Sequence, residues 1–234
     1  MFETRLDGEE FLDGAADAEL SAKSYPFMRF VNRFLGGRKV VTDFFEGEVN
    51  VNELKKIRVL DIGSGMCDIP AALLRWGEKK GVEVEITCLE KNPYALAMAA
   101  QAYWKEVQRL DLKAADLFEF EPARPYDYAV GSMFFHHLTD GEIRAAIEHL
   151  RGFVTKAVLI NDLRRSFWNW TGCVVMRPFL DGRVYNDAAV SVRRGFELAD
   201  LAETLVGVKD AAVTVKRCGL SRIAAVIRFT QEAV

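Results

Sequence analysis

The sequence lacks a long hydrophobic run, a strong excess of one charge, and any closely spaced cysteine pair. Its apolar stretches fall far short of the roughly 18 residues that a membrane-spanning helix needs, so we expect no stable membrane insertion. Lysine and arginine number 31 against 34 aspartate and glutamate residues, a net charge of -3, which offers no basic field to hold a nucleic acid. The four cysteines include no CxxC pair, as expected for reduced thiols. Residues 1–10 are unlike a secretory signal, so a cytoplasmic protein is predicted.

Histidine is scarce as well, with three residues and no HxH or HExxH spacing. Acids at helical spacing do not cluster beyond chance, so the sequence predicts no metal site and a metal-independent chemistry. Half of the residues are hydrophobic, and a chain of this length buries enough surface to form a core without a metal or a disulfide.

Residues 1–56 are predicted to form an N-terminal helical cap. Phe27, Phe30, Val31 and Phe34 recur at a spacing that places them on one helical face. The pair of glycines that follows is a typical helix stop, and a second amphipathic stretch comes after it.

From residue 57 onward, strand-like and helical segments alternate. Strands are predicted over residues 58–62, 82–89, 110–114, 126–132 and 157–161, and helices over 69–76, over 93–107 and from residue 139. Strands separated by helices indicate βαβ units and a mainly parallel sheet with both faces covered. We therefore predict an α/β fold for residues 57–234, as one domain.

After residue 162 this alternation stops. An aromatic segment without strand periodicity begins at residue 164, and residues 164–205 are predicted to include a lid insertion and to end in a helix over about 197–205. Residues 211–217 and 221–229 are predicted as an antiparallel pair of strands at the sheet edge, joined at Cys218 and Gly219.

The most informative segment runs from Val59 to Asp68, where a hydrophobic strand, a Gly-Ser-Gly turn and a helix start follow one another. Gly63 and Gly65 let the backbone turn tightly and let a ligand approach it beyond the strand end. A dinucleotide fingerprint needs a third glycine where this chain has Asp68, and a carboxylate there would repel a pyrophosphate. An adenosyl ligand with cationic groups, S-adenosylmethionine, suits such acids. Taken alone, the turn is a weak signal, because some turns of this kind are only tight βα connections.

Carboxylates stand at the ends of three successive predicted strands. Asp61 is placed to meet the amino-acid end of such a ligand, and Glu90 to accept both ribose hydroxyls. Asp116 is placed to accept from the adenine amino group, with Leu117 and Phe118 flanking the ring. Each acid alone is more often a helix cap or a surface group, but the three together favour an adenosyl site. We expect the crevice at the strand tips to have room for adenosine.

These motifs resemble those of class I S-adenosylmethionine-dependent methyltransferases. The matching strings are VLDIGSG at residues 59–65, CLEKNP around Glu90, ADLF around Asp116 and DYAVGSMFFHHL at residues 127–138. The resemblance covers about residues 57–162 and departs at Cys67, where many members carry a third glycine. It implies a Rossmann-like, seven-stranded, mainly parallel sheet with an antiparallel last strand. It also implies a set of cofactor-binding residues: Asp61, Gly63, Ser64, Gly65, Glu90, Lys91, Asp116, Leu117 and Ser132.

A narrower similarity lies in NRFLGG at residues 32–37, NDLRRS at 161–166 and SVRRGF at 191–196. These strings resemble a bacterial methyltransferase subgroup found beside type III polyketide synthases and phenolic or quinone-like products. The resemblance implies O-methyl transfer to a small apolar acceptor, phenolic or hydroxyquinone in type.

Candidate catalytic residues follow the fourth and fifth predicted strands. In this fold the end of the fourth strand borders the methyl group, and His136 and His137 lie just past it; a histidine suits a general base near neutral pH. Because neighbours in an extended segment point to opposite sides, at most one of the two should face the pocket, and both could instead be structural. Asp162 is an alternative base or orients the substrate, unless it caps a neighbouring helix.

Four further residues are candidates to bind the acceptor. Arg164 and Arg165 could hold a carboxylate or a phenolate, or could simply be a solvated arginine pair. Phe27 and Trp168 belong to aromatic segments predicted to form a lid over an apolar acceptor.

The same residues are compatible with three functions other than O-methyl transfer. A C-methyltransferase of a quinone-type ring would have nearly the same site. An NAD(P)-dependent oxidoreductase on a related fold and a non-catalytic adenosyl-binding module are less favoured interpretations. The sequence is also compatible with a homodimer.

Overall fold

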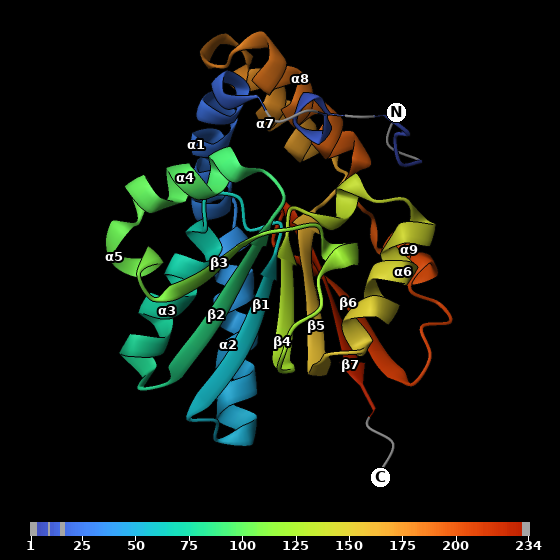
Figure 1. Cartoon of the computed structure of the whole chain (residues 1–234). Helices are drawn as coiled ribbons and strands as arrows, with labels where there is room; N and C mark the ends of the chain where they lie inside the picture. The colour runs from blue at the N-terminus through green and yellow to red at the C-terminus, as the bar shows by residue number, and fades with distance from the viewer. Residues whose placement is uncertain (1–3, 9, 15–16, 231–234) are drawn as a thin grey trace.

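A seven-stranded sheet forms the centre of the computed structural model, which describes residues 4–8, 10–14 and 17–230 (Figure 1). Its strand order is β3-β2-β1-β4-β5-β7-β6. The strands are β1 (Lys56–Ile62), β2 (Glu83–Glu90), β3 (Leu110–Ala114), β4 (Tyr126–Ser132), β5 (Val154–Leu163), β6 (Ala211–Cys218) and β7 (Arg222–Phe229). β1 to β5 run parallel, whereas β7 pairs antiparallel with β5 and β6. The predicted mainly parallel sheet with an antiparallel last strand is confirmed.

Helices cover both faces of this sheet. One face carries α2 (Gly37–Asn52), α3 (Asp68–Lys80), α4 (Pro93–Ala102) and α5 (Trp104–Val107), and the other carries α6 (Asp140–Arg151) and α9 (Leu198–Thr204) (Figure 1). Side chains alternate along β1, so Val59 joins the buried cluster on one face while Leu60 joins the cluster on the other. Burial on both faces explains why the parallel strands are nearly continuously hydrophobic.

A third group of helices lies over the carboxyl ends of the parallel strands. These are α1 (Ala18–Phe34), α7 (Phe167–Met176) and α8 (Gly182–Arg194), which lie together above the sheet in Figure 1. Single 3-10 turns fall in the connecting segments: η1 (Phe11–Asp13), η2 (Leu117–Glu119), η3 (Phe135–His137) and η4 (Arg177–Phe179). This layer encloses the sheet edge at which open α/β folds bind their ligands.

Several boundaries differ from the sequence predictions. The helix predicted over 93–107 is two helices, because the backbone leaves the helical conformation at Tyr103, with φ -130°. α8 was not predicted, and α9 packs against α6 and β6 rather than in the lid. The predicted N-terminal cap divides into α1, over the strand ends, and α2, which packs on the sheet through buried Val41 and Phe45. Its residues 1–3, 9 and 15–16 lie outside the described residues.

None of the helices formed by the described residues is both long enough and apolar enough to cross a membrane.

Candidate cofactor and acceptor sites

Three residues in the left-handed backbone region shape the turn after β1. Gly63 has φ +62°, Gly65 has φ +50° and Cys67 has φ +57°, values that favour glycine. A Cβ at Gly63 would lie only 2.6 Å from Cδ2 of Phe134, so a side chain cannot fit there. Cys67, where the family resemblance would place a third glycine, therefore has a backbone conformation that favours glycine.

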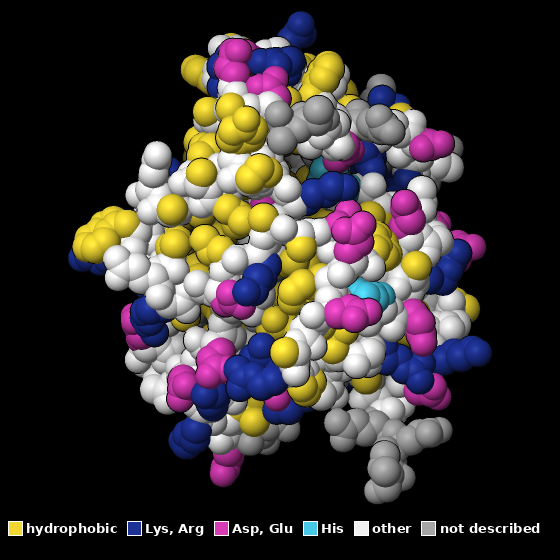
Figure 2. Space-filling model, in the orientation of Figure 1, with side chains coloured by type: hydrophobic (Ala, Val, Ile, Leu, Met, Phe, Trp, Pro, Cys, Tyr) yellow, Lys and Arg dark blue, Asp and Glu magenta, His cyan; other side chains and the backbone are white. Residues whose placement is uncertain are grey.

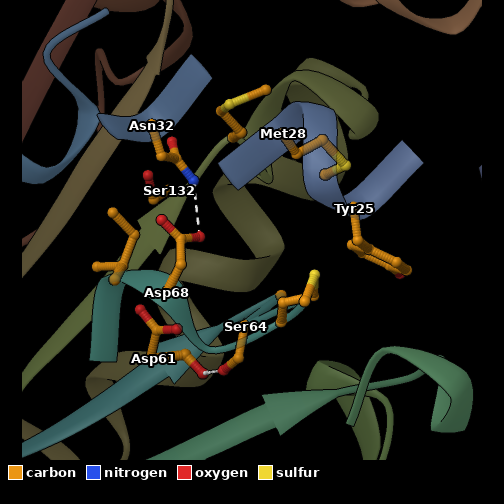
Figure 3. Close-up of a pocket in the computed structure, with 12 residues that line it drawn as sticks. Tyr25, Met28, Asn32, Asp61, Ser64, Asp68 and Ser132 are labelled. Carbon is orange, nitrogen blue, oxygen red and sulfur yellow. Dashed lines mark hydrogen bonds between the residues drawn. The ribbon is translucent and has the colours of Figure 1, made fainter. Parts of the chain in front are cut away.

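Asp61 lies in β1 with a buried carboxyl group and points into a small pocket beyond the strand end (Figure 3). Burial and the carboxylates of Asp68 and Glu90, opposed by the neighbouring Ser64 hydroxyl, raise the pKa of Asp61 to about 8. Ser132, at the end of β4, lines the same pocket. Within residues 4–8, 10–14 and 17–230, no basic side chain forms an ion pair with Asp61. A cationic ligand would suit this pocket.

Glu90, at the end of β2, ties the glycine turn to the neighbouring strand. Its Oε2 accepts a hydrogen bond from the Gly65 N–H over 2.7 Å, and its Oε1 accepts one from the Asn92 N–H over 2.8 Å. Burial raises the pKa of Glu90 despite these bonds. The sequence suggested a carboxylate available to two ribose hydroxyls, but each oxygen already serves the backbone, so a ribose would have to share them.

Asp116 forms the N-terminal cap of η2. Its Oδ1 accepts from the Phe118 N–H over 2.9 Å, and Lys91 donates to its Oδ2 over 3.0 Å. These two contacts hold the pKa of Asp116 below its usual range. Asp116 therefore acts as a helix cap in this conformation, which is the alternative role that the sequence left open for it. Leu117 beside it is buried, and contact of either residue with adenine stays a prediction.

Helix α1 covers this pocket. Tyr25, Met28 and Asn32 of α1 line it from the side opposite Asp61 (Figure 3). Asn32 Nδ2 donates to Oδ1 of Asp68 over 3.1 Å. The space left is about 20 Å³, enough for about one water molecule. The space beside Asp61 is therefore too small for the amino-acid end of an adenosyl ligand in this conformation, because α1 covers it. That end of the ligand would fit only if α1 moved, and room for adenosine beside Glu90 and Asp116 stays a prediction.

A second, larger cavity of about 320 Å³ lies among α1, α7 and α8. Its wall is mostly apolar, and it includes Phe27 from α1 and Trp168 from α7, as the predicted lid requires. Met28 and Met133 line both this cavity and the small pocket beside Asp61, so the two sites adjoin. Hydrophobic side chains also gather on the nearby surface, over α1 and α4 in Figure 2.

One end of the large cavity is polar, where His136 and His137 lie with Glu10 and Asp187. The prediction that at most one histidine faces the pocket is wrong. Both residues belong to the 3-10 turn η3 rather than to an extended segment, so their side chains do not point to opposite sides. Their rings instead lie face to face, with centroids 4.1 Å apart.

Asp162, in β5, contacts both the ring and the backbone of His136. Its Oδ1 lies 2.7 Å from His136 Nδ1, and its Oδ2 accepts from the His136 N–H over 3.1 Å. Burial disfavours the charged imidazole, but the carboxylates of Asp162 and Glu10 outweigh it and raise the pKa of His136 to about 9. At neutral pH this imidazole keeps its proton, unlike the free base that the sequence suggested.

Arg164 and Arg165 do not line the cavity. Arg164 pairs with Glu197 over 3.1 Å. Arg165 is 1% exposed, pairs with Asp200 over 2.7 Å and donates to the Gly195 carbonyl over 2.9 Å. Both arginines that were predicted to bind the substrate thus connect segments of the chain instead. Because Arg165 is buried, the two arginines are not a solvated pair either.

The family described as "Methyltransferase domain" matches residues 59–156. The chain carries a methyltransferase domain. None of the curated proteins matches the sequence.

Solved methyltransferases share the fold. The plantazolicin methyltransferase BpumL, in complex with a pentazolic analogue and S-adenosylhomocysteine, has a TM-score of 0.67 at 12% identity, over 86% of this chain and 88% of that one. Magnesium protoporphyrin IX methyltransferase from Synechocystis PCC 6803, with the same nucleoside bound, has a TM-score of 0.59 at 14% identity, over 91% and 100%. A putative O-methyltransferase from Nostoc punctiforme PCC 73102 has a TM-score of 0.55 at 14% identity, over 74% of this chain and 52% of that one. At such identities the likeness establishes the fold.

Sequence reasoning missed several residues that line the two sites of this methyltransferase. Asp68 was noted only as the residue that replaces a third glycine, and Asn32 only as part of a short string. Glu10 gave no signal, because it lies far along the chain from the histidines it meets. Such a contact depends on how the N-terminal segment packs against α8, which local periodicity does not encode.

Proposed function

We propose that this methyltransferase uses S-adenosylmethionine and transfers the methyl group to the oxygen of a small apolar acceptor, a phenol or hydroxyquinone. The observation that carries the proposal is the apolar cavity of about 320 Å³, which adjoins the glycine turn at Met28 and Met133 and ends at His136 and His137. Ligand pockets measure about 300–1,000 Å³, so this volume is at the small end. The resemblance to the subgroup found beside type III polyketide synthases supports a phenolic acceptor.

The residues of the small pocket suit the proposed cofactor. S-adenosylmethionine carries a sulfonium and an ammonium group, and the pocket gathers the buried carboxyl groups of Asp61 and Asp68, with Glu90 beside them. Asp61 would accept from the ammonium group, Glu90 from the ribose and Asp116 from adenine. When bound, the cofactor supplies an electrophilic methyl carbon, and the electron pair of the broken carbon–sulfur bond stays on sulfur.

The polar end of the large cavity would handle the acceptor hydroxyl. His136 and His137 line this cavity shortly after Met133 in the chain, and Asp162 holds the first of them in place. We assign the protonated His136 to hold the hydroxyl oxygen and His137 to accept the proton of the hydroxyl group. Phe27 and Trp168 would contact the apolar body of the acceptor. Both imidazoles line the acceptor cavity and neither lines the small pocket beside Asp61. Label transfer to an acceptor is therefore the result that would exclude a non-catalytic adenosyl-binding module.

The test is an incubation of the purified protein with methyl-labelled cofactor and a panel of phenols and hydroxyquinones. We expect an O-methyl ether and one S-adenosylhomocysteine per methyl transferred, identified by mass spectrometry. A product methylated on the ring carbon would support a C-methyltransferase instead. Thermal melts with S-adenosylhomocysteine and with NADH separate the cofactors, because only the bound one raises the melting temperature. No label transfer to any acceptor would reject the proposed acceptor class.

A further inference from the structure

We propose that Glu10, His136 and His137 form a binding site for one divalent transition-metal ion, of the zinc class, at the polar end of the large cavity. A ligand atom from each residue lies within 4.8 Å of the other two. His136 Nε2 is 3.5 Å and His137 Nδ1 is 3.9 Å from the same Glu10 oxygen. Ligands about 2.0–2.2 Å from a tetrahedral ion lie about 3.3–3.6 Å apart, so an ion between these atoms requires only small shifts.

The two imidazole nitrogens that face Glu10 make no well-formed hydrogen bond. His136 Nε2 and His137 Nδ1 are both buried and without a hydrogen-bond partner among the described residues, and the His136 side chain is 1% exposed. Buried polar atoms are nearly always paired in native proteins, and each exception needs an explanation. A metal ion would accept the lone pairs of both nitrogens, and His136 would release its extra proton on binding.

Further contacts orient the ligands. The carboxylate of Asp162 lies 2.7 Å from Nδ1 of His136, which leaves Nε2 for the ion. This carboxylate–histidine arrangement is the usual outer support of a metal-bound imidazole. Ser191 Oγ donates to Glu10 Oε1 over 2.7 Å. Asp13 Oδ1 lies 2.7 Å from His137 Nδ1 without the geometry of a hydrogen bond, and it is a second carboxylate within reach of the site.

The charge around the cluster favours a cation. Four carboxyl groups lie in or next to it, those of Glu10, Asp13, Asp162 and Asp187. Arg194 is ion-paired with Asp13 over 2.8 Å, and the charges of Arg5 and Arg222 act on Asp162. These three cations offset part of the acidic charge. A divalent ion would balance the acidic charge that remains.

The donor set selects the class of metal. Two imidazoles and a carboxylate suit zinc and its neighbours, whereas magnesium and calcium prefer oxygen ligands alone. All three ligands line the apolar cavity, so the open coordination position would face the acceptor. This part of the inference rests on the proposed function: a hydroxyl bound there would lose its proton to water more readily. Ion binding itself does not depend on that function.

Cobalt(II) alone is the probe. Untagged, chelator-treated protein is titrated with Co²⁺ and followed by its visible absorption and by calorimetry. We expect one Co²⁺ per chain, a higher melting temperature with the ion, and displacement by Zn²⁺. His137→Gln should weaken Co²⁺ binding by about 100-fold, and Glu10→Gln should weaken it by at least about tenfold. Asp162→Asn removes no ligand and changes only the orientation of His136, so it should weaken Co²⁺ binding by about tenfold.

His149→Gln is the matched control. His149 bonds the Phe120 carbonyl and lies outside the cluster, so this variant should bind Co²⁺ like the wild type. Absence of Co²⁺ binding to the wild type at millimolar concentration, or equal binding by the folded Glu10→Gln and His137→Gln proteins, overturns the inference. S-adenosylhomocysteine binding to the metal-free protein, measured in parallel, separates this failure from a failure of the proposed function.

Discussion

Tyr25 of α1 packs directly on Gly65 of the glycine turn, since a Cβ at Gly65 would lie 3.2 Å from the tyrosine Cε1. Burial and the nearby Glu90 carboxylate raise the pKa of this tyrosine. Together with the hydrogen bond from Asn32 to Asp68, the contact fastens α1 onto the turn that a cofactor has to reach. If the cofactor binds beside Asp61 as proposed, its binding and the displacement of α1 are linked equilibria.

Removal of the tyrosine ring should favour cofactor binding. In Tyr25→Ala the closed position of α1 loses packing while the carboxylates of the pocket stay in place, so we expect S-adenosylhomocysteine to bind about 3- to 10-fold more tightly. Calorimetry measures this. Tyr94→Ala, at an exposed tyrosine on α4, is the control and should bind unchanged. Weaker binding by Tyr25→Ala would show that the ring contacts the cofactor instead of blocking it.

Asp61 should lower the stability of the ligand-free protein at neutral pH. Its folded pKa of about 8 lies above the unfolded value of about 3.9. The folded state thus binds more protons between these values, and the free energy of unfolding falls as pH rises through this window. Asp61→Asn removes this pH dependence. The substitution should therefore raise the free energy of unfolding of the ligand-free protein by about 3 kcal/mol more at pH 7 than at pH 5. Urea titrations at the two pH values test this, and an equal effect of the substitution at both contradicts it.

The same carboxyl group should couple cofactor binding to proton release. If its ionised form binds the ammonium group, affinity for S-adenosylhomocysteine rises with pH up to about 8, by at most about tenfold per pH unit. Calorimetry near pH 7 in buffers of different ionisation enthalpy should record about one proton released. Asp61→Asn should abolish measurable binding while remaining folded. Binding without proton release would remove Asp61 from the proposed ammonium site.

Arg165 should matter for folding rather than for acceptor binding. Its buried pair with Asp200 and its bond to the Gly195 carbonyl would be lost in Arg165→Ala, and one partner of a buried pair left alone costs about 3–5 kcal/mol. A denaturant titration measures the loss. Arg164→Ala, which breaks a more exposed pair, should cost much less. A folded Arg165→Ala whose main defect is a raised acceptor KM would restore the substrate role.

Filling the large cavity should separate acceptor binding from cofactor binding. Cys173 on α7 is buried and lines this cavity, so the ring of Cys173→Phe would occupy acceptor space. We expect the acceptor KM to rise by about tenfold or more and S-adenosylhomocysteine affinity to stay within about twofold. Cys218→Phe, on β6 and away from the cavity, is the matched control. Equal KM values for Cys173→Phe and wild type would place the acceptor elsewhere.

Much of the fold was predictable because its signals are local. Alternating strand and helix periods, with a Gly-Ser-Gly turn after the first strand, identified every strand of the sheet. Topology then brought Asp61, Glu90 and Asp116 to one sheet edge, since parallel neighbours share their carboxyl ends. What each carboxylate contacts was not predictable: the Gly65 N–H bonds Glu90, and Lys91 bonds Asp116.

By itself, then, the sequence determined the strands, most of the helices, the glycine turn and the acids that follow the strands, because backbone preferences and hydrophobic periods act over a few residues. Only the tertiary structure decided that α1 closes the cofactor pocket, that Arg165 is buried, and that Glu10 meets His136 and His137 at the end of an apolar cavity. These outcomes depend on which distant surfaces pack together, and packing is settled by the shape and charge of side chains that local patterns do not relate to one another.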